Sequence, residues 1–452
     1  MKKKTACTVL LILAVILTIR CSKDTGSNPS SKVTAALITV VSGNLQNGQG
    51  GKTLAEPVVL RVTDSRGTPL TDVALYAVIV EGSGSIKGPT VIDTDEDGTI
   101  RIQWIIGSSY NGMEVRIVDT MVEGDPCYVF AAGENPAGLH VSRTLTSLRK
   151  LHDCLYEMTF YGDYSGIVEN QNRQLISYYS SNINPSISND FNCSVFSVMG
   201  DLNNCLFGRS FDNPEDWRCI TMLCRFQPPD GYASLVPTRT KELGYEVGTD
   251  LTGLSLTQRE GLLKAPFFSP DGINEHGLVV ALADIPSRTF TPSPEKHSIY
   301  KTYLIREILD HAQTVDEAYE IARQHNCYDL GLNVFSTHAL VADPSGQSAV
   351  LELAGGEMRA IRNTESWQVA TNSPLYNVSL YGARLQCSRF RTIYDQLASA
   401  QGMLTWQQGM NILATVGWEF TQWSIVYDMT NRSLELALDF DFSEYYHFEF
   451  NE

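Results

Sequence analysis

The chain has 452 residues, of which 43% are hydrophobic and 10% aromatic. This length and composition suffice for about three domains with buried cores, and they exclude disorder, collagen-like repeats or a coiled coil as the main architecture. Asp and Glu together number 51 against 34 Lys and Arg, which gives a net charge of −17. Because an acidic surface repels phosphate backbones, nucleic acid is not expected as a partner.

The first 20 residues are expected to be a signal peptide. A basic start is followed by an apolar stretch at residues 7–19, which is too short for a comfortable bilayer span but typical of a secretory signal. Cys21 comes next, and a cysteine in that place resembles the acylated first residue of bacterial lipoproteins. Arg20 and Thr18 depart from the lipoprotein pattern, so simple secretion stays open. We expect export to the bacterial cell envelope, with Cys21 as a lipid anchor to the membrane.

Residues 33–132 are predicted to form a β-sandwich. Short apolar strands at residues 57–64, 73–80 and 99–106 alternate with turn signals, and no helical period is present. This region resembles bacterial immunoglobulin-like domains of the invasin type, which implies a spacer role more than catalysis. The polar residues 21–32 in front of it are predicted to be a tether.

The composition changes to mixed α and β beyond about residue 138. Residues 133–192 are expected to be a linker that becomes a prosegment if the chain is cleaved, and residues 193–452 form the second domain. Its expected strands are 193–200, 277–285, 339–354, 367–372 and 423–438, and its expected helices are 298–312, 314–325 and 388–400. Thr314 and Ser388 stand at expected N-caps, and Glu317 completes a capping box with Thr314. Sheets covered by helices are therefore predicted.

Candidate chemistry centres on Cys193, which opens an apolar strand. The turn signal DLNN follows at residues 201–204, and the segment 206–212 returns as the second strand of a hairpin. The hairpin brings Arg209 and Asp212 back beside Cys193, where a guanidinium favours thiolate and a carboxylate can orient an amino group. Regular alternation would place Arg209 and Asp212 on opposite faces, so one of them must lie past the regular pairing. From these residues alone, Cys193 is only a candidate, since buried cysteines are usually small hydrophobes.

Nine motifs between about residues 151 and 426 resemble, in order, those of the linear amide C–N hydrolases, which include choloylglycine hydrolases and penicillin acyltransferase. They are LYEMTFYGDY, CSVFSVMG, FGRSFDN, PPDGYASL, GINEHGLVVALADIP, ALVADPSGQSAVLEL, ATNSP, SRF and QWSIVYD. The resemblance implies an N-terminal-nucleophile hydrolase with an αββα four-layer sandwich. The whole chain is then α+β, with the all-β immunoglobulin-like domain in front.

The resemblance also assigns roles to the hairpin. Cys193 would be the nucleophile, released as a new N-terminus by cleavage after Asn192, and its α-amino group would act as general base. Asp212 would hold that amine. Arg209 would favour the thiolate and later the charge on the acyl oxygen.

Two more residues enter through the resemblance. Asn372 would donate a hydrogen bond to the tetrahedral oxyanion, and Arg389 would be a second cation near the nucleophile. Without the surrounding motifs, the favoured interpretation of Asn372 would be a turn residue before Pro374, and that of Arg389 a solvated position at a helix start. Asp284 stands where some relatives carry an oxyanion-hole Asn, and because an anion would oppose the developing charge it is given no catalytic role.

Other cysteine chemistry is less favoured. Eight cysteines lie outside the signal and the anchor, an even number that suggests disulfides, but their spacings show no compact framework. Cys219 and Cys224 lack the spacing of a zinc or redox pair, so neither a metal nor another cofactor is expected. The eight histidines offer a papain-like Cys/His alternative, yet none lies in a recognisable thiol-protease setting; His276 is predicted to be a turn residue and His338 a strand entry.

Three functions remain open at this stage. The leading hypothesis is a hydrolase of linear, non-peptide amides that acts on a small molecule through a Cys193 thioester. An acyltransferase would use the same site with an amine in place of water. An inactive surface adhesin would retain the fold without needing the five residues Cys193, Arg209, Asp212, Asn372 and Arg389. The substrate and the oligomeric state are not predicted from the sequence.

Overall fold

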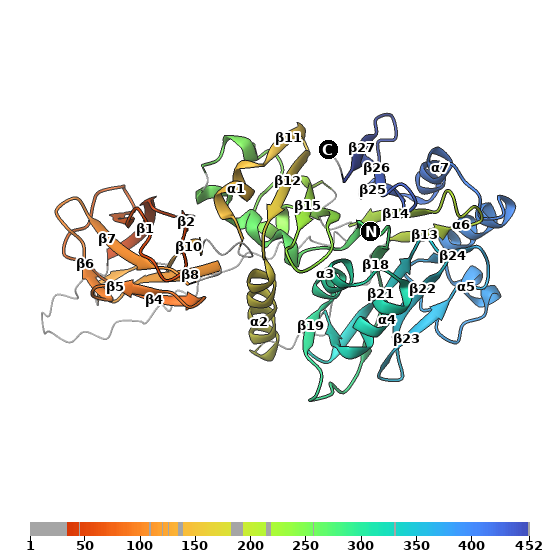
Figure 1. Ribbon diagram of the computed structural model, residues 1–452, viewed down its shortest axis with the longest axis horizontal. Helices are drawn as coiled ribbons and strands as arrows, with labels where there is room; N and C mark the ends of the chain where they lie inside the picture. Colours follow the sequence, from red (N-terminus) through yellow and green to blue (C-terminus); the bar gives the residue numbers. More distant parts are fainter. Residues whose placement is uncertain are drawn as a thin grey trace, which may run out of the picture.

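The computed structural model describes residues 34–450 except 45, 108–109, 120, 125, 134–138, 182–192, 214–217, 256 and 330. The expected signal and tether, the anchor Cys21 and the cleavage residue Asn192 lie outside the described residues. Two folded units follow one another along the chain, a smaller all-β unit and a larger mixed unit (Figure 1). Within this described part of the chain, every helix is too short or too polar to traverse a lipid bilayer.

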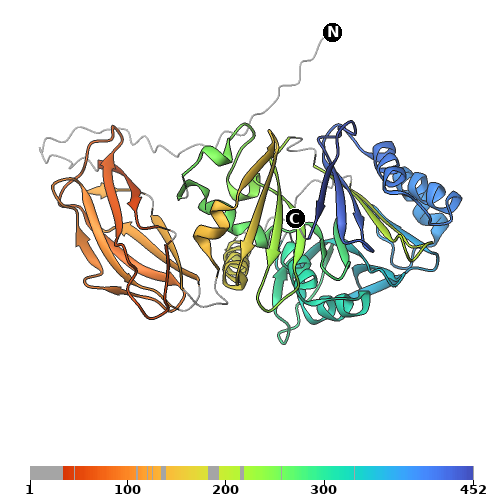
Figure 2. The same cartoon turned by 45° about the horizontal axis from the view of Figure 1, so that its top comes forward.

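The N-terminal unit consists of two five-stranded sheets packed on each other (Figure 2). One sheet has the order β5 (Ser85–Lys87), β7 (Thr99–Ile105), β3 (Val58–Asp64), β1 (Thr34–Ser42) and β9 (Val122–Glu123). The other has the order β2 (Gln46–Gly48), β10 (Cys127–Gly133), β8 (Tyr110–Ile117), β4 (Ala74–Glu81) and β6 (Val91–Asp93). Alternate residues such as Val58, Leu60 and Val62 point into one apolar core. The predicted β-sandwich is therefore confirmed.

The larger unit contains a nine-stranded sheet and a six-stranded sheet. The first has the order β11 (Arg149–His152), β12 (Leu155–Tyr161), β15 (Thr221–Gln227), β16 (Ser234–Arg239), β17 (Asp271–Asn274), β18 (Val279–Thr289), β21 (Val334–Ala342), β22 (Ser348–Ala354) and β23 (Glu357–Arg362). The second has the order β24 (Trp367–Ala370), β13 (Ser194–Val198), β14 (Leu206–Asp212), β25 (Thr421–Asp428), β26 (Ser433–Leu438) and β27 (Tyr446–Glu449).

Helices cover the outer face of each sheet. The helices are α1 (Val141–Thr146), α2 (Ser165–Ser181), α3 (Lys301–His311), α4 (Val315–Gln324), α5 (Leu380–Gln386), α6 (Ser388–Ser399) and α7 (Trp406–Val416). The helices α3 and α4 pack on the nine-stranded sheet, and α6 and α7 pack on the six-stranded sheet (Figure 1). Short strands β19 (Ser298–Tyr300) and β20 (Asn326–Tyr328) pair beside α3.

Three apolar cores separate these four layers. The middle core joins residues from both sheets, among them Val195, Leu340 and Ile425. One outer core lies between the nine-stranded sheet and its helices, and the other between the six-stranded sheet and α5–α7. Because both faces of the sheets are covered, strands such as β13 are buried along their whole length and show no alternation with polar residues. The expected αββα sandwich is confirmed.

Two local expectations need correction. Residues 149–161, expected within the linker and prosegment, form β11 and β12, and β12 pairs in parallel with β15 inside the nine-stranded sheet. The apolar segment LYEMTFY is buried there, as its composition requires. The capping box of Thr314 and Glu317 is confirmed, but Ser388 is the first residue of α6 and not its cap, because the carbonyl of Cys387 accepts the first helical hydrogen bond.

Candidate active site

Cys193 directly precedes β13, at one end of the predicted hairpin. The strands β13 and β14 pair antiparallel from Val198–Leu206 to Ser194–Ser210. Asp212 lies beyond this last pair, as the alternation of side chains demands, and its backbone carbonyl lies 4.0 Å from the Cys193 Sγ. The Cys193 thiol is 4% exposed and free, and the other described cysteines form no disulfide.

A close contact between a glycine and an aromatic ring helps to fix this hairpin. Gly208 is paired with Phe196 across the two strands, and a Cβ atom at Gly208 would lie 2.2 Å from the Phe196 ring. The glycine therefore leaves room for the ring beside the strand that carries Arg209.

The thiol opens into a cavity of about 230 Å³. Its apolar lining residues are Phe211, Phe268, Pro270, Leu282 and Tyr300, and its polar ones are Cys193, Arg209, Asp212, Asn213, Arg239, Glu242, Asp284, Lys301 and Thr302. No histidine is among the described residues that line it. The cavity thus combines one thiol with charged and apolar side chains, without the ring of a papain-like pair.

Arg209 is held by two residues that the sequence did not indicate. Its Nε lies 3.2 Å from Oδ2 of Asp271, and the Tyr427 hydroxyl donates to Oδ1 of the same carboxylate. All three side chains are at most 1% exposed. Burial raises the pKa of Asp271, and the Arg209 guanidinium opposes that rise. Asp271 and Tyr427 therefore fix Arg209 from behind while its charge faces Cys193.

The pKa of the Cys193 thiol is raised, contrary to the simple expectation that Arg209 favours the thiolate. Burial is the largest cause, Arg209 lowers the pKa, and the carboxylates of Asp212 and Asp284 raise it further. Because the charged form is disfavoured, a base has to accept the thiol proton at neutral pH. The arginine alone does not activate this nucleophile.

Asp212 carries one satisfied and one unsatisfied oxygen. Its Oδ1 accepts hydrogen bonds from the Ser210 hydroxyl at 2.7 Å and the Thr421 hydroxyl at 2.5 Å. Its Oδ2 is buried and has no hydrogen-bond partner among the described residues. Burial raises the pKa of Asp212, while these hydrogen bonds and the nearby arginines lower it. A buried carboxylate oxygen without a donor is costly, and it suits a cationic or N–H partner.

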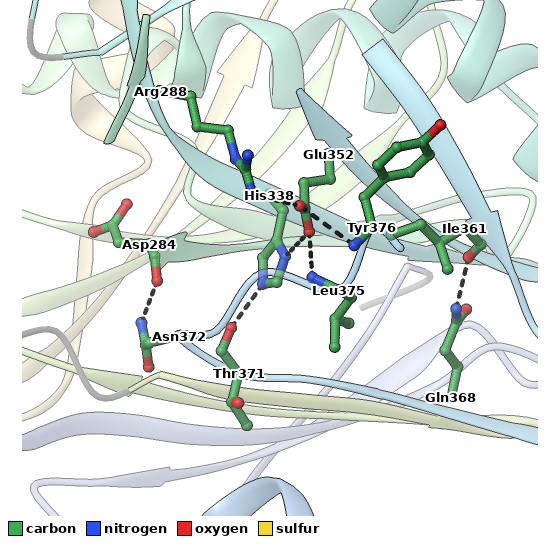
Figure 3. A network of polar contacts seen from close by, with 10 residues as sticks. All are labelled: Asp284, Arg288, His338, Glu352, Ile361, Gln368, Thr371, Asn372, Leu375 and Tyr376. Carbon is green, nitrogen blue, oxygen red and sulfur yellow. Dashed lines mark hydrogen bonds and ion pairs between the residues drawn. The ribbon is translucent and has the colours of Figure 1, made fainter. Parts of the chain in front are cut away.

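Arg389 and Asn372 reach Cys193 as a chain of hydrogen bonds. Arg389, in the first turn of α6, donates through Nη1 to the Cys193 carbonyl at 2.6 Å and to the Ser194 hydroxyl at 2.9 Å. Its Nη2 donates to Oδ1 of Asn372 at 2.9 Å. The Asn372 Nδ2 donates to the Asp284 carbonyl at 2.7 Å (Figure 3). Asn372 is thus linked to the nucleophile through one guanidinium, although its side chain does not line the cavity.

The charge of Asp284 is balanced by a lysine that the sequence did not indicate. The Lys301 Nζ lies 2.7 Å from Oδ1 of Asp284, which also accepts from the Thr337 hydroxyl at 2.9 Å. Burial acts to lower the pKa of Lys301, but the negative charges of Asp284 and Asp329, together with Tyr300 and the hydrogen bond to Asp284, outweigh it and the pKa is raised. An acidic residue at this position is therefore compatible with developing negative charge nearby, since Lys301 neutralises it.

The structure brings all five predicted site residues together around the start of β13. The charged residues missed by the sequence, Asp271 and Lys301, come from β17 and α3 and contact the site only through the tertiary fold. For Asp271, the available signal was that a charged residue stands inside a fully buried strand.

Residues 265–440 match the protein family described as acyl-coenzyme A:6-aminopenicillanic acid acyl-transferase. The matched region contains Asn372 and Arg389 and begins after Cys193, Arg209 and Asp212. No curated protein matches the chain.

Two solved structures illustrate the similarity. A conjugated bile acid hydrolase from Clostridium perfringens is 14% identical and covers 57% of this chain and 92% of that one, with a TM-score of 0.42. A penicillin V acylase from Agrobacterium tumefaciens is 17% identical and covers 54% of this chain and 83% of that one, with a TM-score of 0.39. These scores are too low to carry an argument by themselves, and the four layers are defined by the strand order and the cores described above.

Proposed function

We propose that the chain, whose residues 265–440 match the family described as acyl-coenzyme A:6-aminopenicillanic acid acyl-transferase, cleaves linear, non-peptide amides with Cys193 as nucleophile. The observation that carries the proposal is the convergence on Cys193 of residues distant in sequence. Arg389 donates to its carbonyl, Arg209 faces its thiol, and Asp212 lies beside it with an unsatisfied oxygen. A purely structural cysteine needs none of these partners.

The first step of the proposed mechanism is cleavage between Asn192 and Cys193. It releases an α-amino group, whose ordinary pKa of about 7.7–8.0 makes it a base near neutral pH. This amine accepts the thiol proton that burial otherwise retains, and the unsatisfied Oδ2 of Asp212 accepts a hydrogen bond from the resulting ammonium. The released amine thus accounts both for the unsatisfied Oδ2 of Asp212 and for the raised pKa of the Cys193 thiol.

The thiolate then attacks the amide carbonyl and forms a tetrahedral oxyanion. Asn372 donates its remaining Nδ2–H to that oxygen, a contact worth about 3 kcal/mol in the transition state. Collapse of the intermediate breaks the C–N bond, the ammonium returns its proton to the leaving amine, and the acyl group remains on sulfur. Water, deprotonated by the same amine, hydrolyses the thioester and regenerates the thiol. Arg209 and Arg389 keep the site positive throughout.

The cavity indicates the kind of acyl group. A compact, apolar acyl chain can pack against Phe211, Phe268 and Leu282, while the charged and polar lining residues can contact the amide and its amine portion. An acyltransferase is the second candidate, because the matched family is described as an acyl-transferase. Adding a competing amine such as hydroxylamine separates the two: a transferase yields the new amide in excess of the acid.

Two measurements test the proposal. Intact mass spectrometry of the purified protein is expected to show two fragments that separate between Asn192 and Cys193. A panel of N-acyl 4-nitroanilides is expected to release nitroaniline with the wild-type protein. A single uncleaved chain whose Cys193 resists iodoacetamide, and which releases no nitroaniline, would contradict the proposal.

We further propose that the protein is exported and anchored through lipid on Cys21. The basic start, the apolar stretch at residues 7–19 and the cysteine that follows support this placement. Expression in a bacterial host with labelled palmitate is expected to label the wild-type chain. The variant Cys21→Ser should remain unlabelled and leave the membrane fraction; equal labelling of both would refute the anchor.

A further inference from the structure

Behind Asn372, a histidine and a glutamate are buried between the two sheets. His338 on β21 lies directly opposite Glu352 on β22, and both side chains are fully buried. Leu340 and Val350, two residues away along the same strands, belong to the middle core. Since side chains alternate along a strand, His338 and Glu352 also point between the sheets, toward the six-stranded one.

The pair holds the loop that follows β24. The Nε2 atom of His338 lies 2.7 Å from the Thr371 carbonyl, which can only accept a hydrogen bond. Glu352 accepts from the backbone N–H of Leu375 at 2.7 Å and from that of Tyr376 at 3.4 Å. The loop that carries Asn372 is therefore fastened on both sides of that residue to the opposite sheet (Figure 3).

Polar contacts join the two residues to each other and to the loop. Burial alone would raise the pKa of Glu352, but contacts with His338, the Leu375 N–H and Arg288 lower it below its ordinary value. An ionised carboxylate only accepts hydrogen bonds, and Oε2 of Glu352 faces Nδ1 of His338 at 3.4 Å. The His338 ring therefore connects a carboxylate on one side to the Thr371 carbonyl on the other.

The orientation of Asn372 depends on this loop. Its Oδ1 accepts from Arg389 and its Nδ2 donates to the Asp284 carbonyl, so the amide cannot flip without losing both hydrogen bonds. One Nδ2–H bond is left without a partner among the described residues. A displacement of about 1 Å is enough to weaken such a donor toward a developing oxyanion.

We propose that His338 and Glu352 are positioning residues that hold the Asn372 loop so that its remaining N–H meets the oxyanion. The inference rests on the proposed function, and neither residue touches the substrate. It assigns a purpose to two buried titratable side chains that a core built only for stability would replace with apolar ones.

Two reactions of the same thiol test the proposal. Acylation by 4-nitrophenyl butyrate passes through a tetrahedral oxyanion, whereas alkylation by iodoacetamide is a direct displacement that forms none. Burst kinetics of nitrophenol release gives the first rate, and mass spectrometry of the Cys193 peptide gives the second. The ratio of the two rates reports oxyanion stabilisation separately from the reactivity and folding of the thiol.

The variants His338→Gln and Glu352→Gln are expected to lower this ratio about tenfold, because part of the oxyanion contact is lost. The matched control is Gln368→Met. Gln368 on β24 also ties the two sheets, through its Nε2 to the Ile361 carbonyl at 2.7 Å and its Oε1 to the Ser348 hydroxyl at 2.7 Å, but it does not hold Asn372 (Figure 3). Its ratio is expected to stay within about twofold of wild type.

A double-mutant cycle with Asn372→Ala decides whether the pair acts through that residue. In the Asn372→Ala background, His338→Gln should change the ratio no further. Additive losses, or an unchanged ratio in both single variants that still alkylate at the wild-type rate, would overturn the inference. Failure of the wild-type protein itself to be acylated would instead overturn the proposed function, and the two results are distinguishable.

Discussion

The two pairs of packed sheets in this molecule bury different kinds of side chain. Among the described residues of the N-terminal sandwich, the buried polar side chains are the uncharged Thr94, Thr99 and Asn111. Between the sheets of the larger unit, the side chains that are at most 1% exposed include those of Arg209, Asp212, Asp271, His338 and Glu352. Both structures are sheet-on-sheet packings, so the architecture alone does not require this difference.

The contrast shows which kind of buried side chain serves stability and which kind serves chemistry. Taking a charge out of water costs several kcal/mol even after pairing, and apolar side chains of similar volume often serve stability equally well. The N-terminal sandwich shows the apolar solution. In the larger unit, the buried charges of Arg209, Asp212 and Asp271 lie at the end of the hairpin that begins with Cys193, which indicates that these three are retained for reactivity.

The largest expected effect tests that separation directly. Cys193→Ala should abolish release of nitroaniline from acyl anilides, with a loss of about 10⁴-fold or more because the nucleophile is removed. Its thermal unfolding should stay near that of the wild type. The control is Cys205→Ala, which truncates a fully buried cysteine of the middle core and should leave the reaction intact. Wild-type activity in Cys193→Ala would show that the charges buried beside Cys193 do not serve a reaction of its thiol.

The next prediction concerns the buried pair behind the nucleophile. Asp271→Leu alone should cost about 3–5 kcal/mol of the free energy of unfolding, because it leaves the Arg209 charge buried and unpaired. Adding Arg209→Met and Tyr427→Phe should restore most of that stability while the activity stays absent. Urea unfolding and the anilide assay measure the two outcomes. A triple variant as unstable as the single one would show that the pair serves stability.

The parts of this site that the sequence predicted are those encoded locally. The hairpin of residues 194–212 follows from two apolar runs around a turn signal, and the capping box at Thr314 lies within four residues. The motifs in their order added Asn372 and Arg389. These features need no knowledge of how distant segments pack.

The residues that were missed depend on long-range packing. Arg209 and Asp271 are 62 positions apart, and Tyr427 and Asp271 are 156 apart, so no periodicity relates them. His338 was predicted to be a strand entry, whereas it lies in the middle of β21, fully buried. A charged residue within an apolar strand was the available signal, and only the opposing sheet reveals its partner.

A smaller, pH-dependent effect is expected where the two units meet. The Asn44 amide donates to Oε2 of Glu260 at 2.7 Å, and burial raises the pKa of Glu260 to about 7, although that hydrogen bond lowers it. Unfolded Glu260 loses its proton near its ordinary value of 4.5. Its contribution to stability is therefore complete below that pH and is lost as the pH rises through about 7.

Glu260→Gln should remove this part of the pH dependence, since the amide is neutral throughout and its oxygen still accepts from Asn44. Urea unfolding at pH 5 and pH 8 measures it, with the exposed Glu56→Gln as control. The assignment would be contradicted if the wild-type protein became more stable from pH 5 to pH 8 and Glu260→Gln removed that increase.

The smallest expected effect lies farthest from the buried charges. Helix α4 packs on the outer face of the nine-stranded sheet, and the hydroxyl of its N-cap, Thr314, accepts from the Glu317 N–H at 3.3 Å. Thr314→Ala should lower the free energy of unfolding by about 1 kcal/mol, whereas Thr314→Ser should keep most of it because the hydroxyl remains. Neither variant should alter the acylation or the alkylation rate of Cys193, because α4 and the middle core lie on opposite faces of the sheet. If Thr314→Ala slowed acylation of Cys193 but not its alkylation, helix α4 would be coupled to the Asn372 loop. Residues that serve stability and residues that serve reactivity would then not be separated into different layers of the fold.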